Sequence, residues 1–314
     1  MIHIVFIQSE KNKINNNSIE SLVAIQNFSK QTNDEIYAIT FNNDVANELK
    51  NYHLGKVIYV DNTELQEYNP LYYTSAFKQL TEKYSPNFIC FGHTYQTRDW
   101  VARLSARLDI PFIADCVNFT IDDNISFYRP IYQAKLNEKV TLNDKGIISF
   151  QAGSYSKDDI QSGQTDIEQI TLDLSDTPKT IRPGEKFKET AGGVDLTSAD
   201  VIVSIGRGIS KEENIPVAQS LADKLNAQIG ASRPVVDAGW LDHSRQVGSS
   251  GQTVSPKLYF SIGISGAIQH LVGMKGSKNI IAINKDPNAP IFEIADYAVV
   301  GDIFEILPKL TEQL

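Results

Sequence analysis

Cysteine is scarce in this chain, with only two among 314 residues, and methionine and tryptophan are equally rare. Cys90 and Cys116 are both flanked by apolar residues, and they form neither a C-x-x-C motif nor a regular framework. This argues against a disulfide scaffold and against a redox pair, so we expect two reduced thiols in a core. The five histidines show no spacing typical of metal ligands, and we expect no metal site.

Long hydrophobic runs and an excess of basic residues are also absent. No apolar run approaches the ~18 residues that a membrane-spanning helix needs. The strand-like run Met1–Ile7 leaves no room for a targeting peptide before it, so we expect a cytoplasmic protein. The net charge is -9, and no basic stripe is interleaved with aromatic residues. Nucleic acid is therefore not an expected partner.

The first half of the chain alternates strand-like and helical patterns, which is typical of a parallel, doubly wound α/β sheet. The expected strands are 2–7, 36–41, 56–60 and 87–91, and the expected helices are 18–28, 73–84 and 98–108. Ser18 is the expected N-cap of the first helix. Between residue 126 and about residue 174 the segments are short, and we expect 131–142 and 146–150 to form antiparallel hairpins appended to the sheet.

Residues 173–195 are rich in Asp, Pro, Lys and Gly with weak periodicity, which predicts an interdomain linker. The alternation then restarts and predicts a second α/β domain. Its expected strands are 200–205, 258–262, 279–283 and 297–300, and its expected helices are 215–225, one from Ser265 onward, and 303–314.

Polar, glycine-containing loops follow the expected strands of the second domain, at 204–210, 230–240, 245–253 and 263–270. Gly263–His270 combines a glycine turn with the start of a helix, where free backbone N–H groups favour a phosphate. Alone, each loop has a simpler interpretation: a tight turn at Arg207, a surface ion pair at Arg233, a mobile loop at 245–253, a structural role for His270. Together, at one rim of a parallel sheet, they predict a nucleotide-type cofactor site.

Several of these blocks resemble the electron transfer flavoprotein α-subunit family. They are Gly230-Ala-Ser-Arg, Val235-Val-Asp-Ala-Gly, Gln246-Val-Gly, Gly263-Ile-Ser-Gly-Ala-Ile-Gln-His and the block 283–292, with looser similarity at 102–111 and 128–132. The resemblance implies two doubly wound α/β domains. The first, 1–190, would contact a β subunit, and the second, 191–314, would be a Rossmann-like, deoxyhypusine-synthase-like FAD-binding domain.

The resemblance also assigns roles within the second domain. Arg207, Ser232 and the Ser265–His270 turn would hold the FAD pyrophosphate and ribityl chain, with Asn284 and Asp302 toward the adenosine. Arg233 would lie against the flavin ring, Ser250 would hydrogen-bond near N5, and His270 would face the N1/C2=O edge, so these three would tune the flavin. The full set of implied FAD-binding residues is Arg207, Ser232, Arg233, Val247, Gly248, Ser249, Ser250, Ser265, Gly266, Ala267, Ile268, Gln269, His270, Asn284, Asp302 and Ile303.

The chain departs from the family pattern in two places. Ser249-Ser250-Gly251 stands where many members have Gln-Thr-Gly, which keeps a hydroxyl at the N5 position. Residues 241–245 (Leu-Asp-His-Ser-Arg) also differ from the commoner sequence.

The implied function is the α subunit of a heterodimeric electron carrier, not an enzyme with its own substrate. It would take electrons from flavin-dependent dehydrogenases, such as the acyl-CoA dehydrogenases of fatty acid β-oxidation, and pass them to a quinone oxidoreductase or similar acceptor. One alternative is a subunit of an electron-bifurcating flavoprotein complex that uses NADH. Another is an NAD- or thiamine-diphosphate-type enzyme with a similar nucleotide-binding domain.

Overall fold

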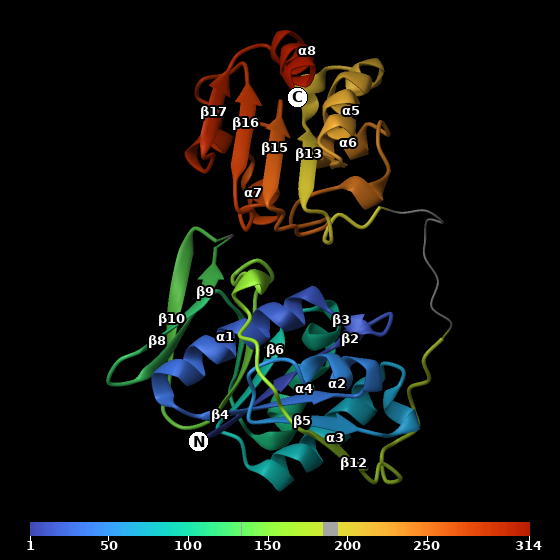
Figure 1. Cartoon of the computed structure of the whole chain (residues 1–314), viewed down its shortest axis with the longest axis vertical. Helices are drawn as coiled ribbons and strands as arrows, with labels where there is room; N and C mark the ends of the chain where they lie inside the picture. Colours follow the sequence, from blue (N-terminus) through green and yellow to red (C-terminus); the bar gives the residue numbers. More distant parts are fainter. Residues whose placement is uncertain (133, 185–193) are drawn as a thin grey trace. The chain divides into compact units, whose positions relative to one another are not determined.

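The computed structural model describes residues 1–132, 134–184 and 194–314, which form two compact units (Figure 1). Unit 1 precedes residues 185–193 and unit 2 follows them. The boundary that the sequence predicts between residues 190 and 191 lies outside the described residues, as does part of the predicted linker.

Unit 1 is built on a seven-stranded sheet in which every neighbouring pair is parallel, in the order β12-β5-β4-β1-β6-β11-β7. Its strands are β1 (Ile2–Phe6), β4 (Glu35–Thr40), β5 (Lys56–Val60), β6 (Phe88–Gly92), β7 (Phe112–Cys116), β11 (Gly146–Phe150) and β12 (Ile167–Ile170). The prediction of a doubly wound parallel sheet is confirmed, although β7 and β12 were not predicted.

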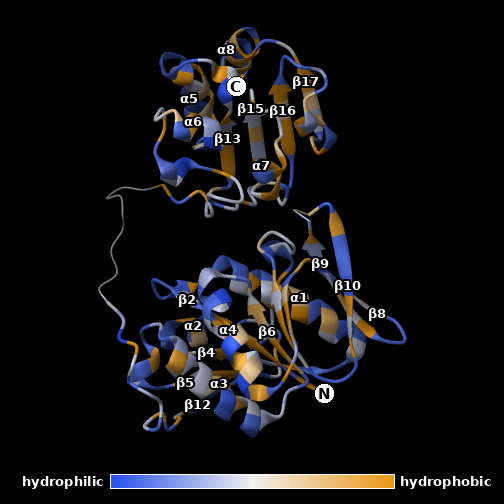
Figure 2. Cartoon of the chain, turned by 180° about the vertical axis from the view of Figure 1, so that it is seen from behind, coloured by the Kyte–Doolittle hydropathy of each residue, from blue (hydrophilic) through white to orange (hydrophobic). Residues whose placement is uncertain are grey.

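Helices cover both faces of this sheet. The helices α1 (Asn16–Thr32) and α2 (Asn43–Leu49) pack on one face, and α3 (Pro70–Tyr84) and α4 (Tyr95–Leu108) pack on the other. Apolar residues accordingly concentrate in the sheet and on the helix faces turned toward it (Figure 2). Both free cysteines are buried: Cys90 lies in β6 and Cys116 ends β7.

The first helix begins earlier than its sequence predicts. Asn15, not Ser18, is the N-cap, and its side chain accepts a hydrogen bond from the amide of Asn17. Ser18 is buried inside the helix, where its Oγ accepts from the amide of Gln8 at 3.1 Å. The Asn-rich segment before Ser18 contains several residues able to cap, so composition alone does not locate the start.

A second, antiparallel sheet is attached to unit 1. It contains β8 (Asn118–Ile121), β9 (Ile125–Ile131) and β10 (Leu136–Leu142), in the order β10-β9-β8. A hairpin in this region is as predicted, but the assignment of 146–150 to a hairpin is wrong. Those residues form β11, which is buried at every position and pairs in parallel with both β6 and β7. Burial on both faces is typical of an interior parallel strand.

Part of the predicted linker packs against unit 1. Leu174 is only 5% exposed and lies in the core formed with α3 and α4. The hydroxyl of Thr177 donates to that of Ser75 at 2.9 Å. The beginning of the 173–195 segment is therefore held on the first unit by side-chain contacts.

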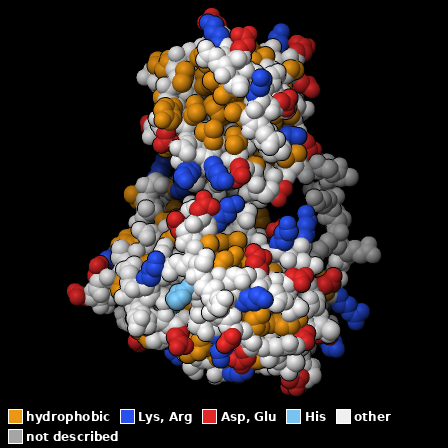
Figure 3. Space-filling model, in the orientation of Figure 1, with side chains coloured by type: hydrophobic (Ala, Val, Ile, Leu, Met, Phe, Trp, Pro, Cys, Tyr) orange, Lys and Arg blue, Asp and Glu red, His pale blue; other side chains and the backbone are white. Residues whose placement is uncertain are grey.

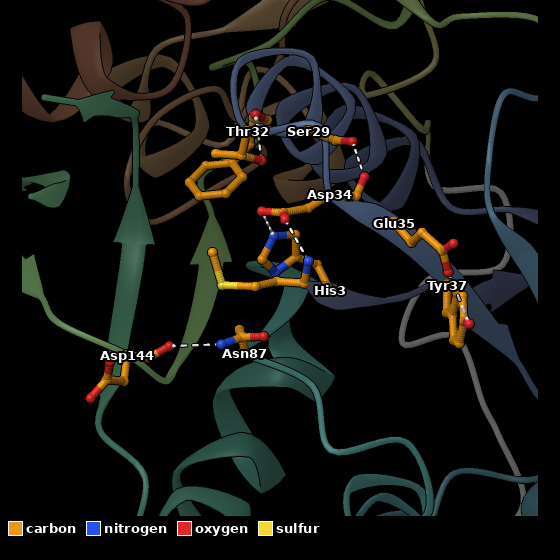
Figure 4. Close-up of polar contacts among 10 residues, drawn as sticks. His3, Ser29, Thr32, Asp34, Glu35, Tyr37, Asn87 and Asp144 are labelled. Carbon is orange, nitrogen blue, oxygen red and sulfur yellow. Dashed lines mark hydrogen bonds and ion pairs between the residues drawn. The ribbon is translucent and has the colours of Figure 1, made fainter.

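A buried polar contact anchors the beginning of β1 (Figure 4). Nε2 of His3 lies 3.0 Å from Oδ2 of Asp34, and the ring of His3 stacks on Phe88 with centroids 5.3 Å apart. Burial lowers the pKa of His3. This histidine therefore has a structural role. Within the described ranges, no group of three or more His, Cys, Asp or Glu side chains could hold a metal ion.

Unit 2 has one five-stranded parallel sheet in the order β14-β13-β15-β16-β17. Its strands are β13 (Val201–Ile205), β14 (Gln228–Ala231), β15 (Leu258–Ile262), β16 (Ile280–Asn284) and β17 (Tyr297–Val300). Its helices are α5 (Ile215–Lys224), α6 (Arg233–Asp237), α7 (Ile268–Val272) and α8 (Ile303–Gln313). Strand β14 was not predicted, and α7 begins at Ile268 rather than Ser265. Among the helices that the structure describes, none combines the length and the apolar character needed to cross a membrane.

Exposed apolar side chains gather at the β17 edge of unit 2, and hydrophobic side chains form a visible patch on this unit (Figure 3). Tyr297 is 65% exposed and Val300 is 56% exposed, while Phe304 at the beginning of α8 is 37% exposed. Edge strands with apolar side chains are prone to pair with another chain.

Candidate cofactor site

The carboxyl ends of the unit 2 strands bring several predicted residues to one rim. Arg207 follows β13, Ser232 follows β14, and the Gly263 turn follows β15. Asn284 ends β16, and Asp302 lies between β17 and α8. Because all neighbouring strands of this sheet are parallel, these positions lie at the same edge, where open α/β sheets bind their ligands.

Backbone hydrogen bonds connect the loop after β13 to the turn after β15. The amide of Gly206 donates to the carbonyl of Ile262 at 2.8 Å, and that of Gly208 donates to Gly263 at 3.0 Å. A Cβ added to Gly206 would lie 2.3 Å from the carbonyl oxygen of Gly263. Glycine is thus required at position 206, because the loop after β13 contacts the turn after β15 there. The exposed Arg207 is consequently held beside the Gly263 turn.

The segment after Gly263 presents free backbone N–H groups. No carbonyl or side chain in the described part of the chain accepts a hydrogen bond from the amides of residues 264–269. Helix α7 follows at Ile268 without a side-chain N-cap. Successive unpaired amides form a concavity suited to a phosphate or another anion. The predicted pyrophosphate-binding segment therefore has the donors that the group requires.

Gly266 fixes the path of this segment. Its φ is +89°, and a Cβ at this position would lie 2.2 Å from the amide nitrogen of Ile291. The amide of Ile291 donates to the carbonyl of Ser265 at 3.1 Å. The segment is therefore supported by the loop after β16, and only glycine fits at the contact. Of the neighbouring predicted residues, Ser265, Ala267 and Gln269 are exposed, whereas Ile268 is partly buried.

The loop 246–252 makes backbone hydrogen bonds both to the end of β14 and to helix α7. The amide of Val247 donates to Ala231 at 2.9 Å, and the amide of Ser249 donates to Gln269 at 2.8 Å. Val247 and Gly248 are buried beneath the loop, whereas Ser249 and Ser250 are exposed. The hydroxyl of Ser250 accepts from the side-chain amide of Gln246 at 2.9 Å, so its orientation is fixed while it remains accessible.

Arg233 begins α6 and is exposed. Its Nε lies 3.2 Å from Oδ2 of Asp237, which matches the simpler interpretation of a surface ion pair. Such exposed pairs contribute roughly 0–1 kcal/mol, so the side chain can exchange this partner for a ligand at small cost. The preceding Ser232 is 6% exposed, and its hydroxyl makes no capping bond to α6.

The residues expected near an adenosine also support the rim itself. The side-chain amide of Asn284 donates to the carbonyl of Ile264 at 2.9 Å, which ties β16 to the free-amide segment. Asp302 caps α8 by accepting from the amide of Phe304 at 2.8 Å. Ile303 is 5% exposed and packs in the core beside α5.

His270 is turned into the protein. It is 6% exposed, and its Nε2 lies 2.9 Å from the hydroxyl of Tyr259. Burial lowers the pKa of His270 to about 4, and only the backbone of Val247 opposes this shift. The imidazole is therefore neutral at pH 7. Tyr259 was not predicted as a site residue, although a tyrosine inside an apolar strand indicates a hydroxyl that needs a partner.

The chain matches two family models. Residues 3–175 match the electron transfer flavoprotein domain, and residues 195–275 match the electron transfer flavoprotein FAD-binding domain. The second match includes the Gly263 turn, the free-amide segment and the loop 246–252.

Similar proteins carry related names. The electron transfer flavoprotein subunit alpha of Bacillus subtilis (strain 168) is 41% identical over 274 residues, which cover 86% of this chain and 83% of that protein. The same-named protein of Thermoanaerobacterium thermosaccharolyticum is 35% identical over 320 residues, covering 99% and 96% respectively. The acryloyl-CoA reductase electron transfer subunit beta of Anaerotignum propionicum is 32% identical over 346 residues, covering 99% and 94%. The cofactor of unit 2 is accordingly FAD, and the chain belongs to the electron transfer flavoprotein alpha subunit family, which includes FixB proteins.

Proposed function

We propose that this chain is the FAD-holding α subunit of a heterodimeric electron carrier. The observation that carries the proposal is the run of free amides at 264–269, which lies within the segment matching an FAD-binding domain. The names of the relatives support a partner, because an alpha subunit implies a β subunit. The apolar edge formed by β17 and α8 supports an assembly as well, although the proposed β-subunit contact is with unit 1.

Each predicted residue has a role in this proposal. The free amides and Arg207 would bind the pyrophosphate, and Asn284 and Asp302 would lie toward the adenosine. Arg233 would exchange Asp237 for the flavin ring. Ser250 would present its hydroxyl near N5, since the bond from Gln246 leaves that hydroxyl free to donate. Bound FAD would supply the redox chemistry, while these residues hold and orient it.

Electrostatic preorganisation is the means by which the chain would set the flavin potential. A fixed donor or cation beside the ring stabilises negative charge without reorganising solvent. Arg233 supplies a charge, and the buried His270 supplies a neutral ring whose position is fixed by Tyr259. We therefore propose Arg233, Ser250 and His270 as the tuning residues.

The proposed electron donors are flavin-dependent dehydrogenases, such as the acyl-CoA dehydrogenases of fatty acid β-oxidation. The proposed acceptor is a quinone oxidoreductase or a similar protein, and the proposed location is the cytoplasm. In this role the chain is an electron carrier and converts no substrate of its own.

A second candidate is a subunit of a bifurcating complex that uses NADH. The relative named as an acryloyl-CoA reductase electron transfer subunit favours this candidate, because that name places an electron-transfer subunit with a reductase. We do not propose an NAD- or thiamine-diphosphate-type enzyme, since the family matches cover both units.

Anaerobic reduction of the purified α/β complex separates the two candidates. A simple carrier should lose its visible flavin absorbance when an acyl-CoA dehydrogenase and its acyl-CoA are added, but not when NADH alone is added. Direct reduction by NADH would instead support the bifurcating complex. A mixture without acyl-CoA is the control. A complex that neither reductant bleaches would contradict both candidates.

A further inference from the structure

Tyr259 and His270 form a buried polar contact beneath the candidate cofactor site. Tyr259 is 0% exposed and is the second residue of β15, whereas His270 is 6% exposed and lies in α7. The hydroxyl and Nε2 are 2.9 Å apart. The chain leaves the carboxyl end of β15 at Ile262, so residues 263–269 must fold back along the sheet to make this contact.

The two groups are electrically neutral. Burial raises the pKa of Tyr259 and lowers that of His270, so the phenol keeps its proton and the imidazole carries only one. The phenol therefore has one O–H to donate. The imidazole has one N–H and one bare nitrogen, and the contact with Tyr259 determines which nitrogen is which.

The hydrogen-bond accounting favours one arrangement. Two groups lie beside the phenol of Tyr259: Nε2 of His270 at 2.9 Å and the hydroxyl of Ser204, which has no other hydrogen-bond partner among the described residues. If Nε2–H donated to the phenol oxygen, the phenolic hydrogen would turn to Ser204, and the Ser204 hydrogen would then be buried without an acceptor. Bare Nδ1 would then be directed at the backbone of Val247, whose interaction with the ring favours a proton there. Donation from Tyr259 to Nε2 lets Ser204 donate to the phenol oxygen and places Nδ1–H toward the Val247 backbone, although Nδ1 makes no hydrogen bond of normal geometry.

We propose that Tyr259 is a positioning residue whose O–H donates to Nε2 of His270 and holds the imidazole as its Nδ1–H tautomer. The N–H then points toward Val247 in the loop 246–252, which also carries Ser250. The significance of this tautomer for the flavin rests on the proposed function. In that setting, His270 is a neutral imidazole of fixed orientation that needs no proton from solvent.

Nitrogen NMR of the α/β complex labelled with ¹⁵N-histidine tests the assignment. In a neutral imidazole, the bare nitrogen resonates far downfield of the protonated one. The His270 signals are identified by their loss in His270→Gln. In the wild-type complex we expect Nδ1 to be the protonated nitrogen and Nε2 the downfield one. In Tyr259→Phe we expect both signals to shift toward each other as the Nε2–H tautomer becomes populated.

Ser261→Ala is the matched control. Ser261 lies two residues along the same strand, is 1% exposed, and its hydroxyl has no hydrogen-bond partner in the described part of the chain. Its removal should leave the His270 shifts unchanged. A protonated Nε2 in the wild type would overturn the proposal, and this reading does not require the variant to fold. Unchanged shifts in Tyr259→Phe would overturn it as well. Absence of bound flavin would overturn the proposed function but would leave the tautomer measurement intact.

Discussion

The phenol of Tyr259 and the imidazole of His270 meet at 2.9 Å inside unit 2, and the contact joins β15 to α7. Burial determines the state of both groups. A helix N-terminus disfavours imidazolium through its dipole, but the larger effect on His270 here is desolvation. The site is thus supported from within the core as well as by its exposed loops.

Unit 2 should lose stability in mild acid because of His270. The unfolded-state pKa is 6.5 and the folded-state pKa is about 4, so the unfolded chain binds a proton first as the pH falls. The contribution of neutral His270 to the free energy of unfolding is complete above pH 6.5 and declines toward pH 4. Between pH 7 and pH 5 the free energy of unfolding should fall by about 2 kcal/mol. Urea unfolding at pH 7 and pH 5 should show this loss. In a Trp100→Phe background, Trp240 is the only tryptophan, so its fluorescence follows the unfolding of unit 2. In His270→Gln the loss should be smaller, and an equal loss would contradict the account.

Gly266→Ala should disrupt the free-amide segment. The added Cβ would meet the backbone of Ile291 at 2.2 Å, in addition to the strain of a φ of +89°. Gly239 is the matched control, because its φ is +76° but nothing lies within 4 Å of an added Cβ. Gly239→Ala should cost about 1–3 kcal/mol, and Gly266→Ala should cost more and abolish FAD retention. Equal unfolding free energies and equal FAD retention in the two variants would refute the importance of the Gly266 contact.

Arg233→Ala should lower the midpoint potential of bound FAD. Loss of one charged donor beside the ring corresponds to about 1–2 kcal/mol, or about 20–45 mV for a two-electron couple. Arg233→Lys should retain part of the potential. Asp237→Ala removes the present partner of Arg233 and should leave the potential unchanged or raise it. Spectroelectrochemical titration of the three variants measures these shifts, and a wild-type potential in Arg233→Ala would exclude the proposed role.

Glu20→Gln should stabilise unit 1 in mild alkali. Glu20 is 7% exposed and accepts from the amide of Gly153 at 2.6 Å, and burial raises its pKa to about 7. A carboxyl with a raised folded-state pKa contributes fully below pH 4.5, and this contribution is lost as the pH rises through 7. At pH 8 the free energy of unfolding of the variant should therefore exceed that of the wild type by up to about 3 kcal/mol. The variant should accordingly unfold at a higher urea concentration. The advantage should shrink at pH 5, and no difference at pH 8 would contradict it.

The sequence predicted isolated strands well where turn residues bound a short apolar run. The ends of β5, β15 and β17 agree with the prediction to the residue. The same kind of run at 146–150 was assigned to the wrong sheet, because a short, mostly apolar segment does not specify which strands it pairs with. Register and pairing depend on contacts between distant segments.

The candidate site was predicted in the same partial way. The glycines and polar residues at strand ends indicated the rim, because parallel strands present their carboxyl ends together. The Tyr259–His270 contact was not predicted, since it depends on how the segment after Gly263 folds back over the sheet. The pairing of Arg233 with Asp237, four residues apart, was foreseeable from helical spacing.

Identification of the bound cofactor tests whether unit 2 binds FAD. We predict that the complex of this chain with a co-expressed β subunit is yellow. Its denatured supernatant should contain FAD, as identified by chromatography and mass. Gly239→Ala should retain that FAD, and Gly266→Ala should not. Recovery of FMN alone, or of no flavin after incubation with FAD, would contradict the assignment of unit 2 as an FAD-binding domain.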